Sequence, residues 1–115
     1  MDWFHYRDGQ LYCEDVQLNA LAQQVGTPVY VYSQRTLVDH YDRLAAAFAP
    51  LNPIICYSIK SCANIHICQL LAKRGAGMDV VSGGELYRAK QAGADMDRVV
   101  YAGVGKTDAE IQQAV

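Results

Sequence analysis

Lys60 is the residue of this sequence whose type and position most directly suggest chemistry. It follows the apolar run from Ile54 to Ile59, which has the length and composition of a buried strand. A lysine there must reach water, pair with an acid or take part in a reaction, because an unpaired ammonium in an apolar site is strongly disfavoured. Its neutral amine could attack a carbonyl carbon to form a Schiff base. Taken alone, such a lysine is more often a solvated residue at the rim of a sheet, so the surrounding residues must decide.

Asp79 is the second candidate. It lies in the run from 78 to 82, a predicted strand that we expect to be buried on both faces, so its carboxylate needs a cation or hydrogen-bond donors. If the two predicted strands are neighbours in one parallel sheet, Lys60 is the nearest obvious cation. These two residues would lie near the carboxyl ends of adjacent strands, which is where β/α proteins carry out their chemistry.

Two glycine-containing segments come just before predicted helices. In the first, 82–85, the glycines could bring N–H groups to an anion, but Ser82 and Glu85 also form a capping-box pattern. The second, 103–107, ends like a phosphate-binding P-loop, yet that motif requires a glycine where this chain has Val100. Thr107 with Glu110 instead predicts an ordinary capping box.

The elements that must position these residues alternate along the second half of the chain. The pattern predicts a hairpin around Asp8-Gly9, then a helix, a strand and a second helix, and finally three strand–helix pairs. The expected ranges are helix 17–25, strand 29–32, helix 33–48, strand 54–60, helix 65–74, strand 78–82, helix 85–92, strand 98–102 and a helix from 107 or 108.

Strands that alternate with helices of about ten residues predict an α/β fold with a parallel sheet. Both an open doubly wound sheet and a closed eight-stranded barrel are built from such units. Three strands complete neither architecture, and the last predicted helix runs to Val115 without a capping residue. We therefore expect these residues to form the first part of a longer β/α assembly.

Composition excludes several classes of function. The 115 residues carry a formal net charge of −2 and have no basic stripe or long apolar run, so we expect neither nucleic-acid binding nor a membrane span. The cysteines at 13, 56, 62 and 68 lack the paired spacing of zinc ligands, so no metal is expected. Free thiols and the absence of a leader pattern favour the cytoplasm.

Four separated motifs resemble one known family. They are Gly26-Thr27-Pro28-Val29-Tyr30-Val31-Tyr32-Ser33, Tyr57-Ser58-Ile59-Lys60, Ala76-Gly77-Met78-Asp79-Val80-Val81-Ser82-Gly83-Gly84-Glu85-Leu86 and Val100-Tyr101-Ala102-Gly103-Val104-Gly105-Lys106-Thr107. In this order they resemble the pyridoxal-phosphate-dependent decarboxylases of alanine-racemase-like fold, and within that group the diaminopimelate decarboxylases.

The resemblance implies a cofactor, a reaction and a set of site residues. Lys60 would hold pyridoxal 5'-phosphate through a Schiff base, while Asp79 and Glu85 would line the cofactor pocket and tune the protonation of that lysine. The substrate would be a small amino acid, meso-2,6-diaminopimelate, converted to L-lysine and CO2. Ornithine or arginine decarboxylases, amino-acid racemases and a non-catalytic fragment remain the alternatives.

The resemblance also implies a domain plan. Residues 33–115 would form the first units of a (β/α)8 barrel, and residues 1–32 would contribute to a separate β domain. The family's remaining cofactor and substrate groups, some of them from the partner in a homodimer, would lie beyond position 115. We therefore expect the 115 residues alone to be inactive.

Overall fold

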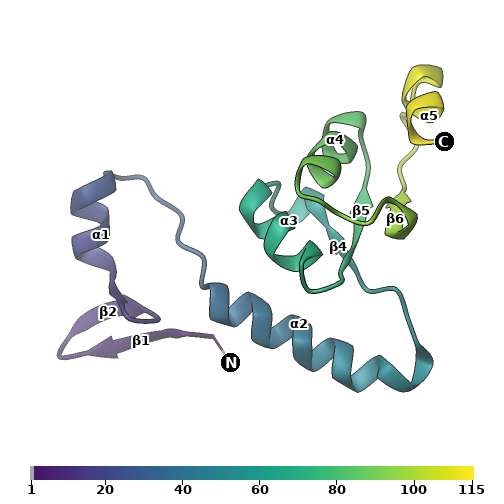
Figure 1. Ribbon diagram of the computed structural model, residues 1–115. Helices are drawn as coiled ribbons and strands as arrows, with labels where there is room; N and C mark the ends of the chain where they lie inside the picture. The colour runs from purple at the N-terminus through teal and green to yellow at the C-terminus, as the bar shows by residue number, and fades with distance from the viewer. Residues whose placement is uncertain (1) are drawn as a thin grey trace. The chain divides into compact units, whose positions relative to one another are not determined.

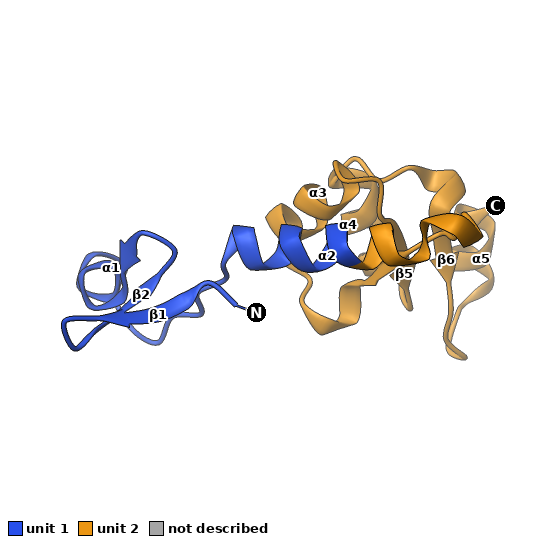
Figure 2. Cartoon of the chain, turned by 90° about the horizontal axis from the view of Figure 1, so that it is seen from below, with its two compact units in different colours: residues 1–43 blue, residues 44–115 orange. Residues whose placement is uncertain are grey.

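The structure is a computed structural model that describes residues 2–115. The chain divides into two compact units, residues 1–43 and 44–115, which Figure 2 shows in different colours. The division falls inside the long helix α2 (Gln34–Phe48). Each unit is described by itself.

The N-terminal unit begins with a small antiparallel sheet and a helix (Figure 1). Its elements are β1 (Phe4–Arg7), β2 (Gln10–Cys13), β3 (Val16–Gln17) and α1 (Leu18–Val25). Strands β1 and β2 pair around Asp8 and Gly9, which have φ angles of 50° and 73°. Two successive residues with positive φ are typical of a type I′ hairpin turn, so the predicted hairpin is confirmed.

Helix α2 is connected to this sheet through Glu14. Its carboxylate accepts hydrogen bonds from the Ser33 hydroxyl and the Arg35 backbone N–H, both at 2.8 Å. The Ser33 hydroxyl in turn accepts from the Thr36 N–H at 3.0 Å, which is the bond expected of a residue that starts a helix. The prediction that Ser33 opens this helix is therefore confirmed.

The predicted strand at 29–32 is wrong. These residues form no regular element, and Val29, Tyr30 and Tyr32 are exposed. Their types are β-prone, but a β preference is expressed only where a strand has a neighbour to pair with and a surface to pack on. Within residues 2–115, the segment has no pairing strand.

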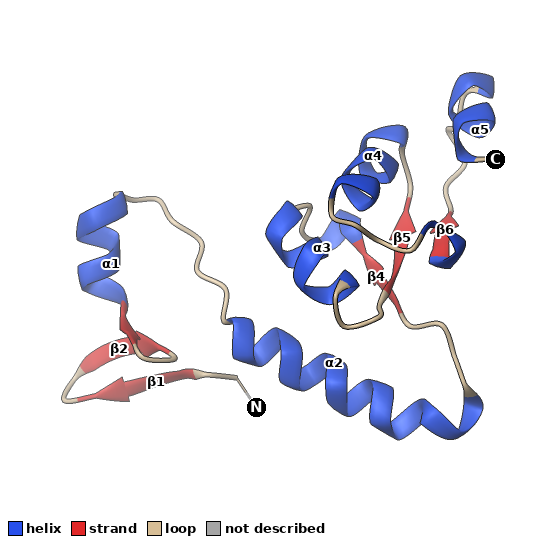
Figure 3. Ribbon diagram, viewed as in Figure 1, coloured by secondary structure: helices blue, strands red, loops and turns tan. Residues whose placement is uncertain are grey.

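The C-terminal unit is a parallel three-stranded sheet with helices between its strands (Figure 3). Its elements are η1 (Ala49–Leu51), β4 (Cys56–Ser58), η2 (Ile59–Ser61), α3 (Ile65–Ala72), β5 (Gly77–Val80), α4 (Gly83–Gln91), η3 (Met96–Arg98), β6 (Val99–Tyr101) and α5 (Asp108–Ala114). The strands lie in the order β4-β5-β6, and both pairs are parallel. The predicted β/α succession is confirmed, with strands shorter than expected.

The core of this unit lies on one face of the sheet. Met78 and Val80 of β5 are fully buried, and they pack with Cys68 of α3 and with Leu86 and Ala89 of α4. Both helices therefore cover the same face. This arrangement differs from a doubly wound sheet, in which helices cover both faces.

The opposite face of the sheet carries the other side chains of the alternating strands. Ser58, Asp79 and Val100 are register partners across β4, β5 and β6. Ser58 and Asp79 are half-buried, and Val100 is 53% exposed. We call this the inner face. The expectation that the strand of Asp79 is buried on both faces is wrong for the residues described, because the helices cover only the other face.

No helix within residues 2–115 is both long and apolar enough to span a bilayer.

Candidate active site

Lys60 lies at the carboxyl end of β4, as the sequence predicted, but its setting differs from the prediction. The strand ends at Ser58, and Lys60 belongs to the 3₁₀ turn η2. Its side chain is exposed, whereas the sequence predicted a lysine in a buried strand. Within residues 2–115 it makes no hydrogen bond or ion pair. The apolar run is divided because Ile59 turns into the core, where it is fully buried, and this brings the next residue to the surface.

Hydrogen bonds on both sides hold the turn that carries Lys60. The Ser61 hydroxyl donates to the Ser58 carbonyl at 2.7 Å, and the Tyr57 hydroxyl donates to the Cys62 carbonyl at 2.9 Å. Asn64 then caps α3 by accepting from the His66 N–H at 2.9 Å. The backbone around the lysine is therefore fixed, while its side chain is left without a partner among the described residues.

Asp79 is found on the neighbouring strand, as expected, but its donor is not the expected one. Its carboxylate accepts from the Ser58 hydroxyl at 2.9 Å, and the two residues are partners across the β4–β5 pair. No ion pair joins Asp79 to Lys60. A neighbouring hydroxyl therefore supplies the hydrogen bond that a half-buried carboxylate needs. Because the strands are parallel, Lys60 stands on the same rim as Val81, two residues beyond Asp79.

Glu85 lies in the first turn of α4, where Ser82 is the N-cap residue. The Ser82 hydroxyl accepts from the Glu85 N–H at 3.2 Å, which confirms half of the predicted capping box. The Glu85 carboxylate reaches one residue further back than that motif requires, and Oε2 accepts from the Val81 N–H at 2.9 Å. Its Oε1 makes no hydrogen bond within residues 2–115. Glu85 therefore closes the end of β5 and keeps one free oxygen at the carboxyl rim of the sheet.

Glu110 of α5 is a residue that the sequence placed only in a local capping box. That box with Thr107 is confirmed. The same carboxylate also accepts from the Gly83 N–H at 2.9 Å, 27 residues away in the chain. The second contact has no local sequence signal, because it depends on how α5 approaches the start of α4. The anion bound by the Gly83 N–H is thus the side chain of Glu110.

Lys106 does not support the P-loop alternative. Its Nζ donates to the carbonyls of Ala102 and Gly103 at 3.0 and 2.6 Å, and it lies 4.9 Å from the centre of the Tyr101 ring. Two carbonyls at the end of β6 therefore bind this ammonium group. It is not turned toward a phosphate loop.

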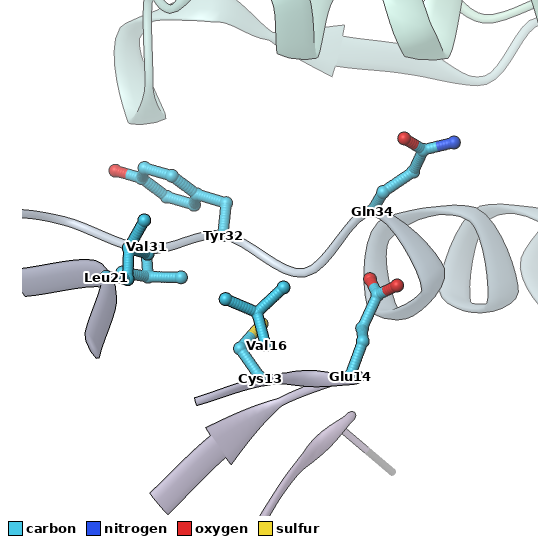
Figure 4. Close-up of a pocket in the computed structure, with 7 residues that line it drawn as sticks. All are labelled: Cys13, Glu14, Val16, Leu21, Val31, Tyr32 and Gln34. Atoms are coloured by element: carbon cyan, nitrogen blue, oxygen red, sulfur yellow. The ribbon is translucent and has the colours of Figure 1, made fainter. Parts of the chain in front are cut away.

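The N-terminal unit has a separate pocket of about 310 Å³, shown in Figure 4. Its lining is mostly apolar and includes none of the predicted site residues; it consists of Cys13, Glu14, Val16, Leu21, Val31, Tyr32 and Gln34. Hydrogen bonds from the Arg35 backbone N–H and the Ser33 hydroxyl hold the pKa of the Glu14 carboxyl below its usual range. We therefore place the candidate active site at the carboxyl rim of the β4-β5-β6 sheet.

Residues 34–115 match the family described as "Pyridoxal-dependent decarboxylase, pyridoxal binding domain". This range covers most of the chain, including the whole β4-β5-β6 sheet. The chain belongs to the pyridoxal-dependent decarboxylase family. Its structure is the N-terminal part of the alanine-racemase-like fold that the sequence predicted.

Relatives within the pyridoxal-dependent decarboxylases carry a more specific name. The chain is 49% identical over 113 residues to the diaminopimelate decarboxylase of Aquifex aeolicus, covering 98% of this chain and 26% of that protein. It is 44% identical over 115 residues to the diaminopimelate decarboxylase of Haemophilus influenzae, covering 100% and 28%. The chain thus spans about a quarter of the length of the curated relatives it matches.

A solved structure agrees with these sequence relatives. The crystal structure of the M. jannaschii diaminopimelate decarboxylase in complex with L-lysine superposes with a TM-score of 0.93 at 37% identity. The match covers 98% of this chain and 27% of that one. Similarity to this pyridoxal-dependent decarboxylase therefore extends through both units of the chain.

Proposed function

We propose that the whole protein containing this chain decarboxylates meso-2,6-diaminopimelate to L-lysine and CO2 with pyridoxal 5'-phosphate bound at Lys60. The observation that carries the proposal is the position of Lys60. Its amine makes no hydrogen bond or ion pair within residues 2–115, and it lies at the rim of the sheet where the strand of Asp79 ends. Support for the substrate comes from the relatives, which are named diaminopimelate decarboxylases at 44% and 49% identity.

The residues at the rim fit this cofactor. Condensation with an aldehyde requires an amine that is neither buried in an ion pair nor tied to carbonyls, because only the neutral form attacks. Lys60 meets this requirement, whereas the ammonium of Lys106 is held by two carbonyls. Pyridoxal phosphate, when bound, supplies the electron sink that takes up the electron pair left by the departing carboxylate.

Asp79 would act on the charge of the amine. Its strand lies beside that of Lys60, and Ser58 fixes its carboxylate at 2.9 Å on the inner face. A carboxylate within a few ångströms favours the protonated form of a nearby amine or imine nitrogen. Asp79 would thus provide a fixed negative charge that tunes the protonation of Lys60.

Glu85 would provide a second fixed carboxylate at the same rim. Its Oε2 is pinned by the Val81 N–H, so Oε1 has a defined position from which to orient a cofactor or substrate group. Together, Lys60, Asp79 and Glu85 come from β4–η2, β5 and α4. Residues of two successive β/α units therefore lie at one rim, which is where active sites of β/α barrels are found.

The one-sided helix cover supports a barrel for the whole protein. Successive parallel strands whose helices all lie on one face build a sheet that can close on itself, with its other face inside. We propose that the inner face of Ser58, Asp79 and Val100 becomes the interior of a (β/α)8 barrel that begins at residue 33. Residues 1–32 would then belong to the separate β domain, and the whole protein would be a cytoplasmic homodimer.

The attachment site can be tested by reduction with borohydride. The whole protein should show the visible absorption band of bound cofactor, and borohydride should fix the pyridoxyl group to the peptide that contains Lys60. Lys60→Ala should abolish both results, whereas Lys73→Ala, which changes an exposed lysine after α3, should abolish neither. A label on Lys106, or no label in a protein that is coloured, would refute the assignment.

The substrate is tested separately by measuring CO2 release. The whole protein should release CO2 from meso-diaminopimelate with a far higher kcat/KM than from ornithine or arginine. Preference for either of the other two amino acids would retain the family chemistry and overturn the substrate. Loss of the optical rotation of L-ornithine or L-arginine without CO2 release would identify a racemase.

A further inference from the structure

Glu110 forms a compact hydrogen-bond network between α5 and the loop that follows β5. Its Oε1 accepts from the Gly83 N–H at 2.9 Å and from the Tyr101 hydroxyl at 3.3 Å. Its Oε2 accepts from the N–H and the hydroxyl of Thr107 at 2.9 and 3.0 Å. Both oxygens are therefore saturated, and all four partners are donors. Four donors around two oxygens match an ionised carboxylate, which only accepts hydrogen bonds. A protonated acid would place its own O–H against one of these donors.

The contact with Gly83 is close enough to account for the glycine. A Cβ at position 83 would lie 3.1 Å from Oε1 and 3.2 Å from Cγ of Glu110, which is tighter than most side-chain contacts. The φ of Gly83 needs no glycine, because only the glycines with positive φ have that requirement and Gly83 is not among them. The absence of a side chain at 83 is thus explained by the approach of Glu110.

Two carboxylates accept from N–H groups of residues 81–84, which join β5 to the first turn of α4 and which we call the β5–α4 loop. Glu85 takes the N–H of Val81 from within α4, and Glu110 takes the N–H of Gly83 from α5. Both lie at the N-terminus of α4, where the free N–H groups and the helix dipole favour negative charge. The position of Glu85 therefore depends on a loop whose other anchor is Glu110.

Tyr101 links the same network to the sheet. Its hydroxyl donates to Glu110, and its ring lies beneath the ammonium of Lys106, 4.9 Å from the ring centre. Tyr101 belongs to β6 and is the register partner of Val80, the last residue of β5. A displacement of Glu110 would thus be transmitted to the ends of two strands at the rim that bears the site.

We propose that Glu110 is a positioning residue for the candidate active site: it fixes the β5–α4 loop and, through that loop, the carboxylate of Glu85. This inference rests on the proposed function. Glu110 itself touches neither Lys60 nor Asp79, and it acts only through the loop. The third β/α unit thereby sets the geometry of a site formed by the first two.

Glu110→Gln in the whole protein is the direct test. Glutamine has nearly the same shape, but its NH2 group is a donor and would replace one of the two accepting oxygens. It would face donors in either orientation, so the hydrogen bonds to at least one of the two positions must break. Amide hydrogen exchange of residues 81–84 should accelerate about tenfold, as expected for the loss of a hydrogen bond of this kind. The kcat per bound cofactor should fall about tenfold with KM within about twofold, because the fixed groups become misplaced.

Asp108→Asn is the matched control. It removes one carboxylate from the same turn of α5 without touching the network, and it should leave exchange, kcat and the cofactor absorption band as in the wild type. If Glu110→Gln fails to fold, Tyr101→Phe and Gly83→Ala perturb the same contact more gently. The first removes one of the four donors, and the second pushes the carboxylate away from the loop.

Two outcomes would overturn the proposal alone. Unchanged exchange at 81–84 would show that Glu110 does not hold the loop. Accelerated exchange with wild-type kcat per cofactor and an unaltered absorption band would show a purely structural role. A wild-type protein without cofactor absorption or CO2 release would instead refute the proposed function and remove the site that Glu110 is said to position, whatever the exchange data show about the loop.

Discussion

Gly77 occupies a position where neighbouring atoms leave no room for a side chain. A Cβ at this position would overlap the Arg98 carbonyl oxygen and would lie 2.8 Å from the Cys56 sulfur. Gly77 starts β5 and is the register partner of Cys56 on β4. The glycine is therefore needed for the approach of neighbouring backbone. Apart from its place in the motif that begins Ala76-Gly77-Met78, no sequence pattern indicates this role.

Gly77→Ala should destabilise the protein by about 1 to 3 kcal/mol, the usual cost of overpacking a well-packed site. Urea denaturation would measure the change from the shift of the midpoint at constant slope. Gly105→Ala is the control, because a Cβ there meets nothing within 4 Å, and its free energy of unfolding should stay within about 1 kcal/mol of wild type. Equal stability of the two variants would contradict the packing argument.

Glu110 should make the free energy of unfolding depend on pH. Hydrogen bonds from the N–H groups of Thr107 and Gly83 lower its pKa to about 2. Because this pKa is lower in the folded than in the unfolded state, the ionised Glu110 contributes to the free energy of unfolding. This contribution is fully present above the ordinary pKa of glutamate and is lost as the pH falls toward 2. Between pH 5 and pH 2, the free energy of unfolding should therefore fall more steeply in the wild type than in Glu110→Gln.

Thermal or urea unfolding at several pH values would check this slope. Asp108→Asn should keep the steep wild-type slope, since it leaves the network intact. Parallel curves for wild type and Glu110→Gln would show that the bonds to Thr107 and Gly83 do not depress the pKa of the carboxyl.

At the scale of the elements, the helices were predictable because their signals are local. Apolar spacing and capping residues predicted α1 through α5 to within a few residues, including the caps Ser82 and Thr107. Strand limits were less predictable. The run from 54 to 60 contains one short strand and a 3₁₀ turn, because Ile59 is drawn into the core beneath α3 and α4. The run at 29–32 has β-prone residues but no neighbouring strand within residues 2–115.

The membership of the candidate site stays a prediction from the sequence, whereas its hydrogen-bond contacts come only from the structure. Lys60, Asp79 and Glu85 were chosen from residue type and position, and the parallel register brings their segments to one rim. Their hydrogen-bond partners Ser58 and Val81 depend on register and loop geometry, which no sequence pattern specifies. Glu110 was missed at this site for the same reason.

The cap of α5 provides a prediction at this scale. Thr107→Ala removes the hydroxyl that accepts from the Glu110 N–H and donates to its carboxylate, and it should cost about 1 kcal/mol of stability. Thr107→Ser keeps the hydroxyl and should lie close to wild type. Denaturation midpoints of the two variants decide the matter. A loss of similar size in Thr107→Ser would point to the methyl group rather than the cap.

For the molecule as a whole, the uncovered inner face is the feature that separates this chain from a finished domain. Val100 is 53% exposed although it lies in the middle of β6. Parallel sheets are normally covered on both faces, so something must cover this one. The relatives are about four times as long, and the barrel proposal assigns their remaining strands to this role.

Val100→Cys should therefore react with a thiol reagent in the 115-residue chain and be protected in the whole protein. Tyr87→Cys is the matched control, since Tyr87 is 61% exposed on α4 and should react in both. Mass spectrometry of the labelled peptides separates these sites from the chain's own four free cysteines. Equal labelling of Val100→Cys in both proteins would contradict the barrel.

The bond from Glu110 to the Gly83 N–H also bears on where such a protein can be divided or circularly permuted. If the protein were separated into two pieces between β6 and α5, the Gly83 N–H at the start of α4 would lose Glu110 as its acceptor. The strand–helix pairs before the cut would nevertheless be intact. Transfer of the β5–α4 unit into another β/α protein should therefore include α5, which supplies this acceptor.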